Sequence, residues 1–203
     1  EGYQYATKAI KVLEANGDQK NLAHVYHTVG FILDHLGKQE ERLEVNQKCL
    51  AISRLLNEED WILRTLNNTG DCYTKLEKYQ EAISFFKECL SLLNIDDCFM
   101  HSVVTCNLGE VYYYNKQYDE AILQFEQSKK NAILNNSKGI EVTNILFISR
   151  CLHKMNHNLK AIEVIRTAID EIDTVHNASK EIDFKENSGL TSPALLKVSR
   201  GIE

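Results

Sequence analysis

The chain has 203 residues, 43% hydrophobic and 26% charged, which is enough for one or two domains with a buried core. A single proline and nine glycines favour helices over the many turns of a β-sandwich. The net charge of −6 provides no basic surface for nucleic acid or an anionic membrane, and no apolar run reaches the roughly 18 to 20 residues of a membrane span.

The chain opens in a helical pattern, EGYQYATKAIKVLEA, with neither an initiator methionine nor a signal peptide. We expect the sequence to be a fragment of a longer protein.

A pattern with a period of about 40 residues follows. Glycines stand at Gly30, Gly70 and Gly109, and the next step reaches Ser149. Three residues after each comes a large side chain: Leu33, Tyr73, Tyr112 and Leu152. Twelve residues after each stand Arg42, Ala82, Ala121 and Ala161, and sixteen after each stand Asn46, Phe86, Phe125 and Ile165. Columns of one size class at a period of 20 to 50 residues indicate a solenoid. The first unit departs from the pattern at Arg42 and Asn46, and the fourth lacks the glycine and the aromatic residue.

Each unit predicts two amphipathic helices. Within 119–134 one helical face collects Ala121, Ile122, Phe125, Ser128, Ala132 and Ile133. The breaks fall at the short polar stretches LGKQ, LEKY, NKQY and MNHN, which suit antiparallel pairs. Small residues in the glycine and alanine columns would let the two helices approach closely.

These columns resemble the tetratricopeptide repeat family over residues 1–176. The resemblance implies an all-α fold, a right-handed superhelical solenoid of antiparallel helix pairs. Residues 1–18 would be the second helix of a truncated repeat, and four repeats would follow near 19–58, 59–97, 98–137 and 138–176. The period exceeds the usual value of about 34. In this it is similar to the repeats of kinesin light chain and of bacterial signalling proteins, where they precede diguanylate cyclase, histidine kinase or DNA-binding domains. Residues 177–203 lose the pattern, and we expect them to be a linker or a C-terminal capping helix.

No motif predicts catalysis, since the chain has no glycine-rich phosphate loop, nucleophile elbow or H-E-x-x-H. The six cysteines lack C-x-x-C spacing, which favours reduced, buried thiols in a cytoplasmic protein over zinc ligands or disulfides. His24 and His27 lie on one helix without an evident third ligand. We therefore expect no enzyme, metal or other cofactor in this chain, although an output enzyme domain would lie outside it.

The resemblance also implies a concave groove lined by the first helix of each repeat. The inward positions that we expect to bind a partner are Phe31; then Arg64, Asn67, Asn68 and Asp71; then Asn107, Glu110, Tyr113 and Tyr114; and then Arg150 and Lys154. The family's carboxylate clamp for chaperone tails is not predicted, because no lysine stands three residues before the glycine column. Asn68 and Asn107 match instead the asparagines with which long-repeat relatives hold a ligand's main chain.

Two functions follow from this pattern. The first is a protein- or peptide-binding module, the regulatory or sensory part of a larger cytoplasmic signalling protein. The alternative is a structural scaffold that self-associates, for example as a homodimer, with no ligand in the groove. A further interpretation is that most of the inward residues belong to an ordinary solvated polar surface that binds no partner. Nucleic acid and membrane are not expected as partners.

Overall fold

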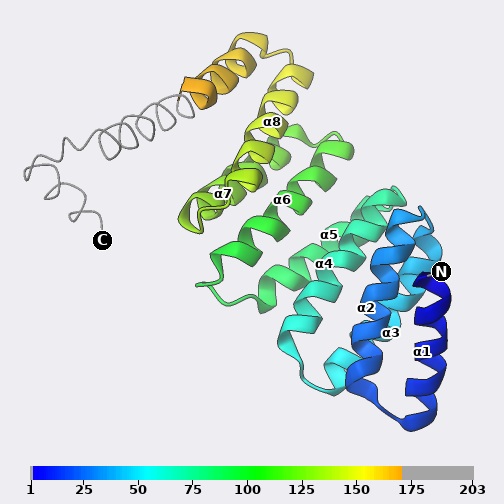
Figure 1. Ribbon diagram of the computed structural model, residues 1–203. Coiled ribbons are helices and arrows are strands. Elements are labelled where there is room, and N and C mark those ends of the chain that lie inside the picture. The colour runs from blue at the N-terminus through cyan, green and yellow to red at the C-terminus, as the bar shows by residue number, and fades with distance from the viewer. Residues whose placement is uncertain (1, 171–203) are drawn as a thin grey trace, which may run out of the picture.

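The computed structural model describes residues 2–170, and all regular structure in that range is α-helical (Figure 1). The helices are α1 (Gly2–Asn16), α2 (Gln19–His35), α3 (Gln39–Leu55), α4 (Glu59–Lys75), α5 (Tyr79–Leu92), α6 (Cys98–Tyr114), α7 (Tyr118–Leu134) and α8 (Lys138–Lys154). Residues 158–170 form a further helix. The expected all-α fold is confirmed, and so are the helix breaks at 36–39, 76–79, 115–118 and 155–158.

One turn recurs between the helices and explains the long period. The second residue after the helix has a positive φ at Gly37, Asn57, Glu77, Lys116, Asn136 and Asn156, and after α1 the first residue, Gly17, has one. After α2, for example, the Gly37 amide donates to Asp34 O and the Lys38 amide to Leu33 O, a closure typical of a left-handed C-cap. Six helices have 17 residues, so two helices with two three-residue turns make a period of 40.

The connection from α5 to α6 is the exception, and it accounts for the spacing of 39 between the second and third glycines. Helix α5 has only 14 residues, and Leu93 after it takes an extended backbone conformation. Asp97 then starts α6 as an N-cap, because its Oδ1 accepts from the Met100 amide at 2.9 Å.

The glycine column lies where the two helices of a pair cross. A Cβ added at Gly70 would come within 2.7 Å of the Phe86 ring, and one at Gly109 within 2.7 Å of the Phe125 ring. Both rings are fully buried. A Cβ at Gly30 would meet Asn46 Oδ1 at 2.9 Å, so a buried amide replaces the aromatic ring in the first pair. The prediction of close crossings at these three glycines is confirmed.

The helix pairs stack into a curved solenoid that runs from the N-terminus towards residue 170 (Figure 1). Each pair packs on the next, with α3 against α4, α5 against α6 and α7 against α8. The first helices also touch one another, α4 with α6 and α6 with α8. The first helices therefore lie side by side on the inner side of the curve. Helix α1 packs on α2 and has no buried residue. The linker or cap expected at 177–203 lies outside the described residues.

Candidate partner-binding surface

All eleven residues expected to bind a partner lie on the first helices α2, α4, α6 and α8. We call the surface that they share the inner face. Phe31 is 62% exposed and Tyr114 is 48% exposed. The cationic side chains of Arg64, Arg150 and Lys154 are also exposed, and the remaining six residues are half-buried. The inner face therefore presents aromatic, amide and charged groups.

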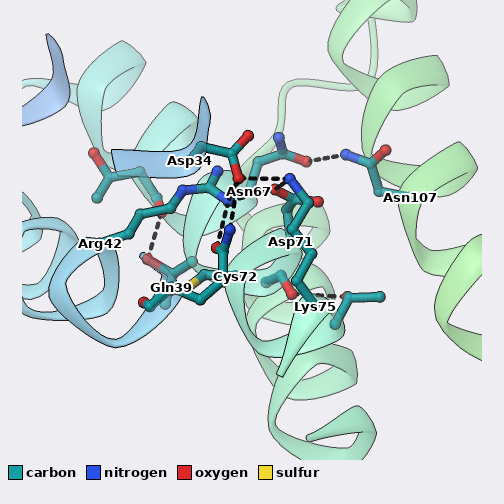
Figure 2. A network of polar contacts seen from close by, with 12 residues as sticks. Asp34, Gln39, Arg42, Asn67, Asp71, Cys72, Lys75 and Asn107 are labelled. Carbon is teal, nitrogen blue, oxygen red and sulfur yellow. Dashed lines mark hydrogen bonds and ion pairs between the residues drawn. The ribbon is translucent and has the colours of Figure 1, made fainter. Parts of the chain in front are cut away.

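Two asparagines join neighbouring repeats at the centre of the inner face. Asn107 Nδ2 donates to Asn67 Oδ1 at 2.9 Å, which links α6 to α4 (Figure 2). The pairing leaves Asn67 Nδ2 as a donor and Asn107 Oδ1 as an acceptor, because neither atom has another hydrogen bond within residues 2–170. A peptide unit offers the complementary donor and acceptor. The sequence analysis named Asn68 and Asn107 as the residues that would hold a ligand's main chain, and in the structure the contact partner of Asn107 is Asn67.

An ionic cluster of Asp34, Arg42, Asp71 and Lys75 links helices α2, α3 and α4 (Figure 2). Arg42 Nη1 lies 2.8 Å from Asp34 Oδ1 and 2.7 Å from Asp71 Oδ2. Lys75 Nζ lies 2.6 Å from Asp34 Oδ1 and 3.1 Å from Asp71 Oδ2. Gln39 Nε2 donates to Asp34 Oδ1 at 3.0 Å. Asp71, expected to meet a partner, is thus paired within the chain.

The charges of this cluster shift its titration. Burial alone would raise the pKa of Asp34, but hydrogen bonds from Lys75 and Gln39 and the charge of Arg42 outweigh burial and lower it. Burial alone would lower the pKa of Lys75, but its hydrogen bonds to Asp34 and Asp71 outweigh burial and raise it. Both groups therefore stay charged at neutral pH.

The sequence carried a signal for this cluster that was not interpreted. Arg42 occupies a column where the other repeats have alanine, and its side chain is only 6% exposed. A buried guanidinium requires anionic partners. The carboxylates that satisfy it come from α2 and α4, which flank its own helix α3.

Aromatic packing defines the part of the inner face between α6 and α8. The Tyr113 ring lies 5.5 Å from the rings of Tyr114 and Phe147, so Tyr113 is largely a packing residue. The Arg150 guanidinium lies over the Phe147 ring at 5.2 Å. Tyr114 remains the better exposed aromatic contact.

Glu110 is a half-buried acid on the same part of the inner face. Burial raises the pKa of Glu110, and the nearby charge of Asp71 raises it further, while Lys75 and Arg150 act in the opposite direction. Within residues 2–170 its carboxylate has no hydrogen bond or ion pair.

The first pair contributes a cluster that the sequence expectation left out. The His24 and His27 rings of α2 lie 4.4 and 4.9 Å from the Trp61 ring of α4, measured between ring centroids. Trp61 was not among the expected site residues. Its signal is weak, because it stands near the start of α4, well before the glycine column.

A cavity of about 410 Å³ lies away from the inner face residues, between α7, α8 and the helix at 158–170. Its walls include Ile145, Leu152 and Val164, with charged side chains such as Glu126 and Lys160 around them. None of the eleven expected residues lines it.

The cysteines are unpaired thiols, and all but Cys98 are buried. Burial raises the pKa of Cys89 and Cys106 to about 12. Such thiols form little thiolate and react slowly. Within the described part of the chain, no helix is long and apolar enough to cross a membrane, and no group of three or more potential ligands is arranged to hold a metal.

Comparison with known families agrees with this geometry. Two models of the tetratricopeptide repeat match the chain, at residues 21–95 and 105–131, which together make up about half of it. The chain belongs to the tetratricopeptide repeat family.

Individual relatives are distant. The Outer dynein arm-docking complex subunit 4 of Xenopus laevis is 22% identical over 189 residues, which cover 89% of this chain and 35% of that protein. The chain thus spans about a third of the length of this relative. BtubC (BKLC) from P. vanneervenii has a similar structure, with a TM-score of 0.67, 18% identity and coverage of 86% of this chain and 80% of that one. Repeats of a putative kinesin light chain from Podosopora anserina give a TM-score of 0.57 at 13% identity, covering 86% and 96%. At these identities the structural likeness shows the fold alone.

Proposed function

We propose that the chain is a protein-interaction module that binds an extended segment of a partner along its inner face. A tetratricopeptide repeat array supports the general role of protein interaction. The observation that carries the finer proposal is the Asn67–Asn107 pair, which offers one free donor and one free acceptor across the joint between two repeats. These groups can pair with a peptide main chain whatever its side chains are.

Exposed side chains on both sides of the amide pair support the proposal. Phe31 on α2 and Tyr114 on α6 provide flat apolar contacts, and Arg64 and Arg150 provide cations. Interface energy commonly concentrates in a few aromatic and arginine residues. We further propose that the chain is the regulatory part of a larger cytoplasmic protein. The much greater length of the dynein-arm docking relative supports the part of this proposal that places the chain in a larger protein.

Self-association is the second candidate function. It is favoured by exposed apolar side chains on the helix at 158–170, where Leu159 is 85% exposed, Ile162 55% and Ile169 51%. Exposed apolar side chains that gather on one helix often mark an interface. Light scattering distinguishes the two candidates, since self-association predicts a solution mass that rises with concentration.

The test of the inner face uses segments selected from a random peptide display library on the wild-type chain. Their dissociation constants are measured for the wild type, Asn107→Ala, Tyr114→Ala and Lys87→Ala. Lys87 is an exposed residue of the second helix α5 and serves as the control. Circular dichroism checks that the helix content of each variant is unchanged.

We expect Asn107→Ala and Tyr114→Ala to weaken binding by about fivefold or more, and Lys87→Ala to leave it unchanged. If Lys87→Ala abolishes binding while both inner-face changes have no effect, the binding surface is elsewhere and the proposal is wrong.

A further inference from the structure

The His24–His27–Trp61 contacts form part of a group rich in hydrogen-bond donors, which we call the donor cluster. It consists of His24 and His27 on α2 and Trp61 and Arg64 on α4. The His24 ring lies at 36° to the indole plane, and the His27 ring meets it edge-on at 78°. Because His24 and His27 are three residues apart, both contact the same indole. Trp61 and Arg64 are likewise one helical turn apart.

The side chains of the donor cluster have no polar partner in the described part of the chain. Within residues 2–170, none of its four side chains makes a hydrogen bond or an ion pair. At the starts of the same helices, Lys20 Nζ is paired with Glu58 Oε1 at 3.0 Å. The other nearby cation, Arg42, is paired with two aspartates. Acidic side chains therefore pair with the neighbouring cations, and no described acidic side chain pairs with the donor cluster.

The charges that act on His27 have one sign. Burial lowers the pKa of His27, and so do Arg64 on α4, His24 on α2 and Arg42 on α3. Among the described residues, no carboxylate acts on His27 in the opposite direction. The free chain therefore keeps His27 neutral at neutral pH, and an anion placed beside it would favour its protonation.

We infer that His24, His27, Trp61 and Arg64 form a proton-linked site for a carboxylate side chain of the bound segment. The guanidinium and the indole N–H can donate to the carboxylate at any pH near neutral. A protonated His27 adds a third, charged donor as the pH falls. This inference rests on the proposed function and adds to it that the segment is acidic where it crosses α2 and α4.

Linkage fixes the sign of the pH dependence. A carboxylate that raises the pKa of His27 is bound together with a proton, so its affinity must increase as the pH falls through the range between the free and bound pKa values. The ordinary pKa of glutamate is about 4.3, so a glutamate peptide keeps its charge over this range.

The experiment uses capped hexaglutamate as the probe and capped hexaglutamine as its neutral control. Titration calorimetry at constant ionic strength gives the affinity of the chain at pH 6.0 and pH 7.5. We expect hexaglutamate to bind about threefold or more tightly at pH 6.0, and hexaglutamine not to bind. Arg64→Gln should weaken binding at both pH values. His27→Gln should remove the pH dependence, and Lys87→Gln should change nothing.

Trp61 is the only tryptophan of the chain, so its fluorescence reports on the site directly. A protonated imidazole in contact with an indole quenches it. Part of this quenching should depend on pH and should be absent in His27→Gln. In the free chain, the midpoint of this pH-dependent part should lie below pH 6.5, and hexaglutamate should move the midpoint upwards.

Failure of hexaglutamate to bind the wild type at pH 6.0, equal affinity at both pH values, or a pH dependence that survives His27→Gln would each overturn this inference. Binding of the display-selected segments distinguishes a failure of this inference from a failure of the proposed function. If they still lose affinity in Asn107→Ala, the inner face remains the binding surface and only the acidic site is wrong.

Discussion

Gly70 shows how closely the two helices of a pair approach. The Phe86 ring occupies the place of its missing side chain, so Gly70→Ala forces one methyl into contact at 2.7 Å. We expect this change to lower the free energy of unfolding by about 1–3 kcal/mol. Gly139→Ala is the matched control, because nothing lies within 4 Å of its added Cβ. It should stabilise helix α8 by about 0.5 kcal/mol. Equal effects of the two changes in urea unfolding would contradict the close crossing.

Glu110 is a residue whose charge opposes folding. Its pKa is raised, so the folded chain binds a proton at a pH where the unfolded chain has lost it. The free energy of unfolding therefore falls as the pH rises from about 4.5, the ordinary value, through the folded pKa. Glu110→Gln should stabilise the chain at pH 7, and the gain should vanish at pH 4. Thermal melts at both pH values test this, and a loss of stability at pH 7 would contradict it.

The turns between helices carry a small strain at the scale of an element. Lys116 follows α6 with φ of 62°, a conformation that glycine adopts without cost. Lys116→Gly should raise the free energy of unfolding by about 0.5 kcal/mol. Gly37→Ala, at φ of 69° after α2, should have the opposite effect. Urea unfolding distinguishes these results, and destabilisation by Lys116→Gly would show that its turn has a different requirement.

Arg42 couples three elements, α2, α3 and α4, through its two aspartates. Arg42→Met leaves Lys75 as the one cation paired with these carboxylates and should cost about 2–3 kcal/mol. Arg54→Met is the control, since Arg54 pairs with Glu88 at an exposed position. It should change stability by less than about 0.5 kcal/mol. A cost for Arg42→Met no larger than that of the control would mean that the cluster does not hold the repeats together.

For the molecule as a whole, the sequence was sufficient to predict the stacked helix pairs. Side-chain size repeats every 40 residues because each Gly–Phe crossing needs one small and one large partner. The side-chain contacts between neighbouring repeats were harder to predict from the sequence. Arg42 was interpreted only as a departure from its column, and the Asn67–Asn107 contact depends on the stagger of α4 against α6. The Trp61 contact with two histidines likewise needs the position of α4 beside α2. Columns within one repeat do not specify these relations between repeats.

The location of a bound segment tests the central claim that the inner face is the binding surface. The most direct measurement is ¹⁵N–¹H chemical-shift mapping with a display-selected segment, including the side-chain carboxamide signals of Asn67 and Asn107. We predict that both carboxamide signals move on binding, together with backbone signals on α2, α4 and α6. Unmoved carboxamide signals, with changes confined to α3, α5 and α7 or to the helix at 158–170, would contradict the account.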